Sequence, residues 1–167
     1  MSQRQMYTVC LVVLLLPSPL YAGDHKESKT MPIVKNTVYT KNCGTCHFAY
    51  QPDLLPARAW VKIINSPGGH AGGDLSLENN EKSEIERYLR QNSAEQSPSK
   101  RSKKILSSLG SDTPVRISEI PYIKKKHREI SQDVFMRKAI GSRANCVACH
   151  RSAASGVYED DDVVIPN

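Results

Sequence analysis

The sequence has few large aromatic residues and few long apolar segments. Its 167 residues include only two Phe and one Trp, so side chains alone offer little material for two separate hydrophobic cores. A chain of this length suits one ordinary domain or two very small ones. Beyond the N-terminal region, no segment approaches the roughly 20 apolar residues that a membrane-spanning helix requires. These shortages predict a small protein whose core includes an apolar group other than its side chains.

The first 22 residues have the pattern of a secretory signal peptide. Arg4 supplies a positive charge, residues 9–16 form a short apolar run, and residues 20–22 end in the small residue Ala22. The alternative is a retained membrane anchor, but the run is short for a bilayer-spanning helix. We therefore expect cleavage near Ala22, export to the periplasm, and no membrane span in the mature protein.

No cysteine is left for a disulfide once two short motifs are set aside. Of the five cysteines, Cys10 leaves with the signal peptide, and the other four form C-x-x-C-H motifs at residues 43–47 and 146–150. This motif attaches c-type haem: the two thiols bond to the porphyrin, and the histidine binds the iron. The sequence therefore predicts two covalent haems, held by Cys43, Cys46, Cys146 and Cys149.

A C-x-x-C pair alone has two other interpretations, half of a zinc site and a thioredoxin-like redox pair. Three observations favour haem: a histidine follows each pair directly, no βαβ pattern surrounds either, and the chain begins with an export signal. Two haems would also supply the apolar core material that the side chains lack. We therefore expect the haem-free protein to be largely unfolded.

His47 and His150, within the motifs, are the expected first ligands of the two irons. The second axial ligand decides the chemistry: histidine gives a low reduction potential, methionine a higher one, and an open position allows binding or catalysis. The mature chain offers five further candidates: His25, His70, His127, Met31 and Met136.

Two of these candidates have a suitable local sequence. His70 lies in a loop with four glycines, which allows the backbone to approach a flat ring closely. His127 lies between Ile123 and Ile130 and can turn with them into an apolar pocket. Each could instead be an ordinary surface histidine, and an exchange of ligands between the halves is an alternative pairing. By proximity in the chain, we expect His47 and His70 on the first iron, and His150 and His127 on the second.

The remaining candidates are weaker. His25 lies close to the expected new N-terminus, where chains fray. Met31 and Met136 are better explained by packing than by iron binding.

The pattern along the chain predicts a mainly α fold with much loop and no long strand. Apolar spacing indicates helices over residues 57–64, about 77–92 and 133–140. A Ser- and Lys-rich stretch separates two halves that are not a clean repeat, and a short basic helix over residues 103–109 is a weak expectation within it. The predicted organisation is a signal peptide (1–22), an N-terminal haem domain (23–96), a linker (97–112) and a C-terminal haem domain (113–167).

Several stretches resemble the bacterial dihaem cytochrome c family. They are CGTCHFAYQPDLLPARAW, the His70 loop with the helix ending in EIERYL, RISEIPYIKKKHREI, and the tail ANCVACHRSAASGVYEDDDVVIP. The resemblance covers about residues 40–166. It implies an N-terminal domain similar to class I cytochrome c, a smaller loop-rich C-terminal haem domain, and bis-histidine haems in an electron shuttle. It also implies two partners, a high-spin, oxygen-binding monohaem cytochrome c and a membrane b-type cytochrome.

The expected function is therefore electron transfer, not catalysis. The alternatives are a small dihaem enzyme of the peroxidase or reductase type and a haem-based sensor, each with one open iron. The sequence shows no further acid–base group for the first and no output module for the second. The formal charge of +6 falls to +5 after cleavage; this excess can steer an acidic partner but is too small to indicate nucleic-acid binding.

Overall fold

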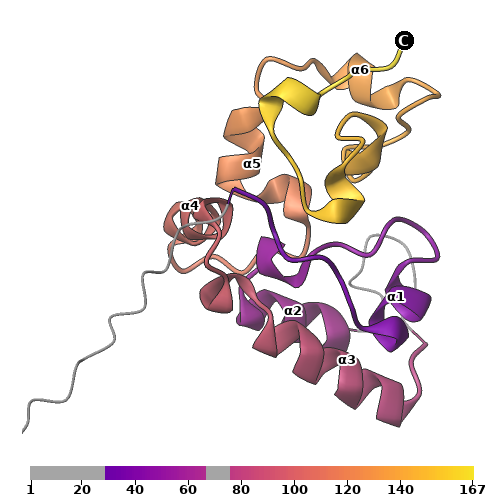
Figure 1. Ribbon diagram of the computed structural model, residues 1–167, viewed down its shortest axis with the longest axis vertical. Coiled ribbons are helices and arrows are strands. Elements are labelled where there is room, and N and C mark those ends of the chain that lie inside the picture. Colours follow the sequence, from indigo (N-terminus) through magenta and orange to yellow (C-terminus); the bar gives the residue numbers. More distant parts are fainter. Residues whose placement is uncertain (1–28, 67–75) are drawn as a thin grey trace, which may run out of the picture.

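The chain folds into short helices joined by long irregular segments (Figure 1). The computed structural model describes residues 29–66 and 76–167, so the predicted signal peptide, His25 and His70 lie outside the described residues. In Figure 1, α1, α2 and α3 form the lower part of the molecule, while α5, α6 and the C-terminal tail form the upper part. The α-helices are α1 (Thr37–Cys43), α2 (Ala57–Asn65), α3 (Asn79–Gln91), α4 (Lys100–Leu109), α5 (Pro121–Lys126) and α6 (Gln132–Met136).

The described residues contain no strand, only one isolated antiparallel bridge between His150 and Val163. The prediction of a mainly α fold is thus confirmed for the described residues. In residues 29–66 and 76–167, six short 3-10 turns supplement the helices. They are η1 (Pro52–Leu54), η2 (Ala94–Gln96), η3 (Ile117–Glu119), η4 (Cys146–Ala148), η5 (Ala153–Ser155) and η6 (Asp160–Asp162).

The α2 helix agrees with its prediction because its apolar residues share one face. Trp60, Ile63 and Ile64 are buried there, and the Trp60 indole donates to the Pro52 carbonyl at 2.6 Å. This face packs against α3, which buries Ile85 and Leu89.

The predicted linker contains α4, a longer helix than the residues 103–109 expected there. The Ser99 hydroxyl caps it by accepting from the Arg101 backbone N–H at 3.1 Å. Its inner face buries Ser102, Ile105 and Leu109, and it packs against η1, η2 and α5. Residues 100–109 are therefore part of the folded body rather than an extended tether, while the domain boundaries stay a prediction.

The α6 helix is shorter than the predicted 133–140. It ends at Met136, and the next residue, Arg137, leaves the helical conformation with ψ of 141°. The Arg137 guanidinium donates to the Pro166 carbonyl at 2.8 Å. The residue that follows the helix is thus bonded to the C-terminal tail, 29 residues further along the chain.

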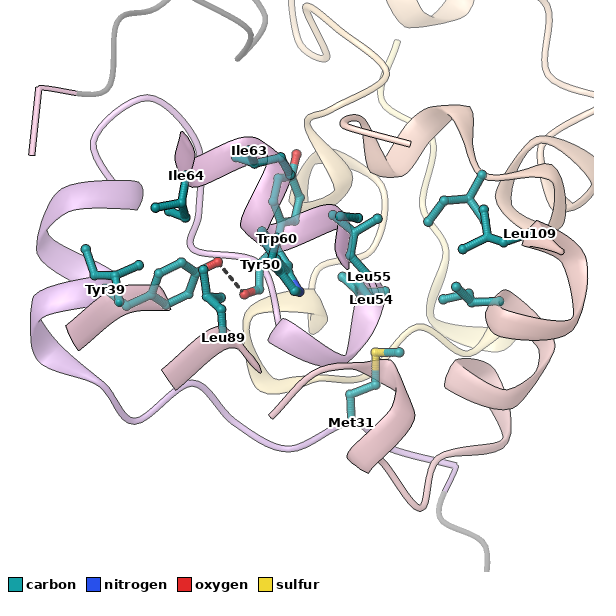
Figure 2. Close-up of a cluster of buried hydrophobic side chains, with 14 of the residues drawn as sticks. Met31, Tyr39, Tyr50, Leu54, Leu55, Trp60, Ile63, Ile64, Leu89 and Leu109 are labelled. Atoms are coloured by element: carbon teal, nitrogen blue, oxygen red, sulfur yellow. Dashed lines mark hydrogen bonds between the residues drawn. The ribbon is translucent and has the colours of Figure 1, made fainter. Parts of the chain in front are cut away.

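One continuous core connects the two halves of the chain. It extends from Met31 and Tyr39 to Ile120 and Tyr158. Figure 2 shows the Tyr39 hydroxyl pointing at the Tyr50 carbonyl, with Leu109 of α4 on the far side of the cluster; this hydrogen bond is 2.8 Å long.

A buried hydrogen-bond chain adds to this connection. The Tyr158 hydroxyl donates to Gln51 Oε1 at 2.5 Å, and Gln51 Nε2 donates to the Ala153 carbonyl at 2.7 Å. Gln51 follows the first motif by four residues, and Ala153 follows the second by three. The segments after the two motifs are thus held against each other.

Asp53 is a buried acid whose ionisation opposes folding. Its side chain is 2 % exposed, Oδ2 accepts from the Ser97 hydroxyl at 2.8 Å, and Oδ1 has no hydrogen-bond partner. Burial raises the pKa of this carboxyl to about 6. Because the folded form binds the proton more tightly than the unfolded form, this group's contribution to stability falls as pH rises from about 4 through about 6.

We therefore expect the Asp53→Asn variant to gain stability relative to wild type as pH rises. The difference in unfolding free energy should grow by about 2–3 kcal/mol between about pH 4 and pH 8, since one pKa unit corresponds to about 1.4 kcal/mol. Guanidinium unfolding of the haem-loaded proteins measures it. Asp161→Asn at an exposed position is the control, and an equal pH trend in both variants would contradict the assignment.

Candidate haem sites

The first motif begins at the C-terminal end of α1. The Asn36 side chain caps this helix by accepting from the Tyr39 N–H at 2.6 Å, and Cys43 is its last residue. The chain then turns at Gly44, whose N–H donates to the Thr40 carbonyl at 2.9 Å. A Cβ at Gly44 would collide with that carbonyl oxygen, so the motif's turn requires glycine here. Cys43 is half-buried and Cys46 exposed, and burial raises the pKa of the Cys43 thiol to about 11.

His47 has the orientation of a metal ligand. Its Nδ1 lies 2.8 Å from the Phe48 carbonyl oxygen. Since a carbonyl only accepts, this bond places the proton on Nδ1 and leaves Nε2 as the lone-pair nitrogen. The Tyr50 ring lies against the imidazole, with ring centroids 4.5 Å apart. The expected partner of His47, His70, lies outside the described residues, so this ligand pair stays a prediction.

The second motif forms the η4 turn. The His150 N–H donates to the Cys146 carbonyl at 2.8 Å, and the Val164 N–H donates to the Cys149 carbonyl at 3.0 Å. The first bond folds the histidine back over the motif, and the second attaches the C-terminal tail to it. Cys146 and Cys149 are both half-buried, and burial raises the pKa of the Cys146 thiol to about 11.

The structure brings His127 next to His150 of the second motif, 23 residues further along the chain. His127 follows the last residue of α5, and its Nδ1 lies 2.9 Å from the Ile123 carbonyl oxygen, so Nε2 again carries the lone pair. The imidazoles of His127 and His150 have centroids 5.9 Å apart, with planes inclined at 73°.

This separation suits two ligands of one iron. Metal–imidazole nitrogen bonds are about 2 Å long, so two imidazoles on opposite sides of one metal have centroids about 6 Å apart. Burial, and then the neighbouring His127, lower the pKa of His150, which favours the neutral imidazole that binds metals. His150 Nδ1 is buried without a hydrogen-bond partner. The residues at the second motif therefore fit a bis-histidine haem.

A cavity of about 270 Å³ contains both histidines and both motif cysteines in its wall. Its other surfaces are mostly apolar, as a porphyrin requires, and the long side chains come from α5, α6 and the segments beside them. They include Ile117, Ile123, Ile130, Val134, Phe135 and Ile140.

Two arginines in this wall were not identified from the sequence. Arg101 of α4 donates to the Tyr158 carbonyl at 3.0 Å, its side chain is 13 % exposed, and its Nε is buried without a partner. Arg143 lies over the Phe135 ring at 4.3 Å. Arginine pairs strongly with carboxylates, and a haem carries two propionates. Arg101 lies four residues before the buried Ile105, which was the available signal for its inward direction.

Tyr50 connects the two sites. Its ring lies against His47, it is 7 % exposed, and its hydroxyl donates to the Ala144 carbonyl, two residues before Cys146. A single buried side chain therefore contacts one motif histidine and the backbone beside the other motif.

The weaker ligand candidates, Met31 and Met136, do not line the haem cavity, and His25 lies outside the described residues. Met31 is 2 % exposed within the core, and Met136 is 65 % exposed on the surface. Across residues 29–66 and 76–167, no group of three or more His, Cys, Asp or Glu side chains could hold a metal ion. Within the same ranges, no helix is long and apolar enough to cross a membrane.

Comparison with known proteins agrees with these sites. The family model described as "Dihaem cytochrome c" matches residues 39–158. A diheme cytochrome c from Rhodobacter sphaeroides is 37 % identical, with a TM-score of 0.66, over 76 % of this chain and 99 % of that one. A diheme cytochrome c from Shewanella baltica OS155 is 32 % identical, with a TM-score of 0.65, over 81 % and 96 %. The curated proteins compared include no significant match. The chain therefore belongs to the dihaem cytochrome c family, and it is a haem-based redox protein with two c-type haems.

Proposed function

We propose that this protein is a periplasmic electron carrier with two low-spin, bis-histidine haems and no enzymatic activity. His47 and His70 bind the first iron, and His150 and His127 the second. The N-terminal half corresponds to a class I cytochrome c-like domain, and the loop-rich C-terminal half holds the second haem. Its partners are a high-spin, oxygen-binding monohaem cytochrome c and a membrane b-type cytochrome, as the family resemblance implies.

The observation that carries this proposal is the pair His127 and His150. Their rings are 5.9 Å apart in the wall of one cavity, and the Nδ1–H of His127 is held by the Ile123 carbonyl. A haem held by both histidines would have no open position on its iron, so neither oxygen nor a substrate would bind there directly. A bound haem supplies reversible one-electron chemistry between ferric and ferrous iron.

The chain's own residues prepare this site for electron transfer. Hydrogen bonds from Nδ1 fix the tautomer and ring orientation of His47 and His127. The mostly apolar wall would limit the access of water to a bound haem, which would help to keep its ligand set the same in both oxidation states. A site that rearranges little between the two states exchanges electrons quickly.

Replacing His127 with alanine tests the proposal. The ferric wild-type protein is expected to show two low-spin bis-histidine signals by electron paramagnetic resonance, and its reduced form should not bind carbon monoxide. His127→Ala should convert one of the two haems to high spin and allow it to bind carbon monoxide, and His70→Ala should do the same to the other haem only.

Met136→Leu is the matched control. Met136 is exposed and is the other candidate iron ligand in the C-terminal half of the chain. It should leave both signals unchanged, and wild type should lack the near-infrared band of a methionine–iron bond. A high-spin signal in wild type would instead support an enzyme or a sensor. If neither histidine variant changed the spin state, the ligand assignment would be wrong.

A further inference from the structure

A groove of about 890 Å³ lies along α4 and α5, which pack against each other. The Tyr122 N–H of α5 donates to the Ser108 hydroxyl of α4 at 3.2 Å, which holds the two helices together. Five cations line the groove against two carboxylates. The cations are Lys103, Lys104, Lys125, Lys126 and Arg128, and we call this surface the basic groove.

The cations of the basic groove are accessible to a partner. All five are exposed. The carboxylates are Glu129 and Asp160, and Asp160 pairs with Lys126 at 2.8 Å. A net excess of three positive charges thus remains over one concave surface.

The basic groove adjoins the second haem site. Lys126 and Asp160 line both the groove and the cavity that contains His127 and His150. Lys126 is the last residue of α5, and the next residue, His127, is the proposed iron ligand. A protein seated in the groove would therefore lie next to the second haem, where an electron has the shortest distance to travel.

We propose that the basic groove docks an acidic redox protein, which exchanges electrons with the chain at the second haem. This inference rests on the proposed electron-carrier function and adds the chemistry of the partner and the site of exchange. In each event, one electron passes from the partner's reduced cofactor to one ferric haem iron, which becomes ferrous, and no bond forms or breaks. Complementary charge steers such encounters and raises their rate constants.

A protein fits the groove better than a membrane does. Surfaces that bind anionic lipid combine lysines with large apolar side chains that enter the acyl region. Among the described residues, none of the exposed large hydrophobic side chains, Ile33, Met136, Val164 and Ile165, lines the basic groove. The surface is also concave, so a broad, flat bilayer would not follow it as a protein surface could.

Reduction by flavodoxin, a small acidic flavoprotein, tests the proposal with the mature, haem-loaded protein. The variant Lys104→Glu with Lys125→Glu reverses two charges in the basic groove. The control, Lys29→Glu with Arg87→Glu, makes the same change in net charge at exposed positions outside it. Free reduced lumiflavin serves as a second electron donor, because it is small and does not require a charged docking surface.

At low ionic strength, stopped-flow reduction of the groove variant by flavodoxin should be about tenfold slower than that of wild type. The control pair should change it by no more than about twofold, and the advantage of wild type should vanish at high salt. Lumiflavin should reduce all three proteins equally. A groove variant as fast as the control pair would overturn the docking proposal, while failure of lumiflavin to reduce wild type would overturn the electron-carrier function itself.

Binding to vesicles of phosphatidylglycerol tests the other possible occupant of the groove, an anionic membrane. Wild type and groove variant should both fail to sediment with them at physiological salt. Sedimentation of wild type that is lost in the groove variant but kept in the control pair would assign the groove to a membrane and overturn the proposal.

Discussion

Replacing Cys146 and Cys149 with serine is expected to remove one haem and to unfold most of the chain from residue 121 onward. This part contains two short helices, α5 and α6, of six and five residues, and isolated helices so short are unstable in water. Its apolar side chains surround the cavity beside the second motif. Without a haem they would line an open void, which costs both burial and packing energy.

Mass spectrometry should show the loss of one haem, and hydrogen exchange should show lost protection in residues 121–167. Amides of α2 and α3 should keep most of their protection, because their buried residues pack on each other. The control is Cys146→Ser alone, which leaves one thiol and His150 to hold the haem and should retain the protection. Full protection of residues 121–167 in the doubly substituted protein would show that side chains alone stabilise this half.

The sequence was most informative where the determinants are local. The haem motifs follow from five adjacent residues, and the family match agrees with two c-type haems. The α2 helix follows from the spacing of Trp60, Ile63 and Ile64, which are all buried. In these cases, one short segment contains both the pattern and its cause.

Composition was less informative than periodicity in the segment 97–112. Its serines and lysines suggested a linker, yet Ser102, Ile105 and Leu109 share the buried face of α4. Small hydroxyl residues become buried when a hydrogen bond satisfies them; the Ser102 hydroxyl donates to the Asp53 carbonyl at 2.9 Å. Since that partner lies 49 residues away, the sequence alone does not indicate the bond.

Local sequence patterns also could not predict the contacts between the two halves of the chain. Tyr50 reaches the backbone beside the second motif, and Gln51 joins Tyr158 to Ala153. These partners are about a hundred residues apart, and a single sequence has no periodicity that pairs them. Arg101 is an intermediate case: its spacing from Ile105 indicates an inward direction, but its place in the cavity wall depends on how α4 packs.

Gly156→Ala is expected to destabilise the haem-loaded protein by about 3 kcal/mol, because two penalties coincide at this position. Gly156 has a φ of +78°, a left-handed conformation that costs other residues about 1–2 kcal/mol. A Cβ there would also collide with the Met31 carbonyl oxygen. The Met31 N–H donates to the Gly156 carbonyl at 2.9 Å, so the collision would separate the N-terminal segment from the turn after the second motif.

Gly141 provides a matched control for the collision. It has the same φ of +78°, but nothing lies within 4 Å of its added Cβ. Gly141→Ala should therefore lose only about 1 kcal/mol. Guanidinium unfolding followed by the fluorescence of Trp60, the chain's single Trp, measures both variants. Equal losses would mean that backbone conformation alone requires glycine at residue 156, and that the contact with Met31 contributes no stability.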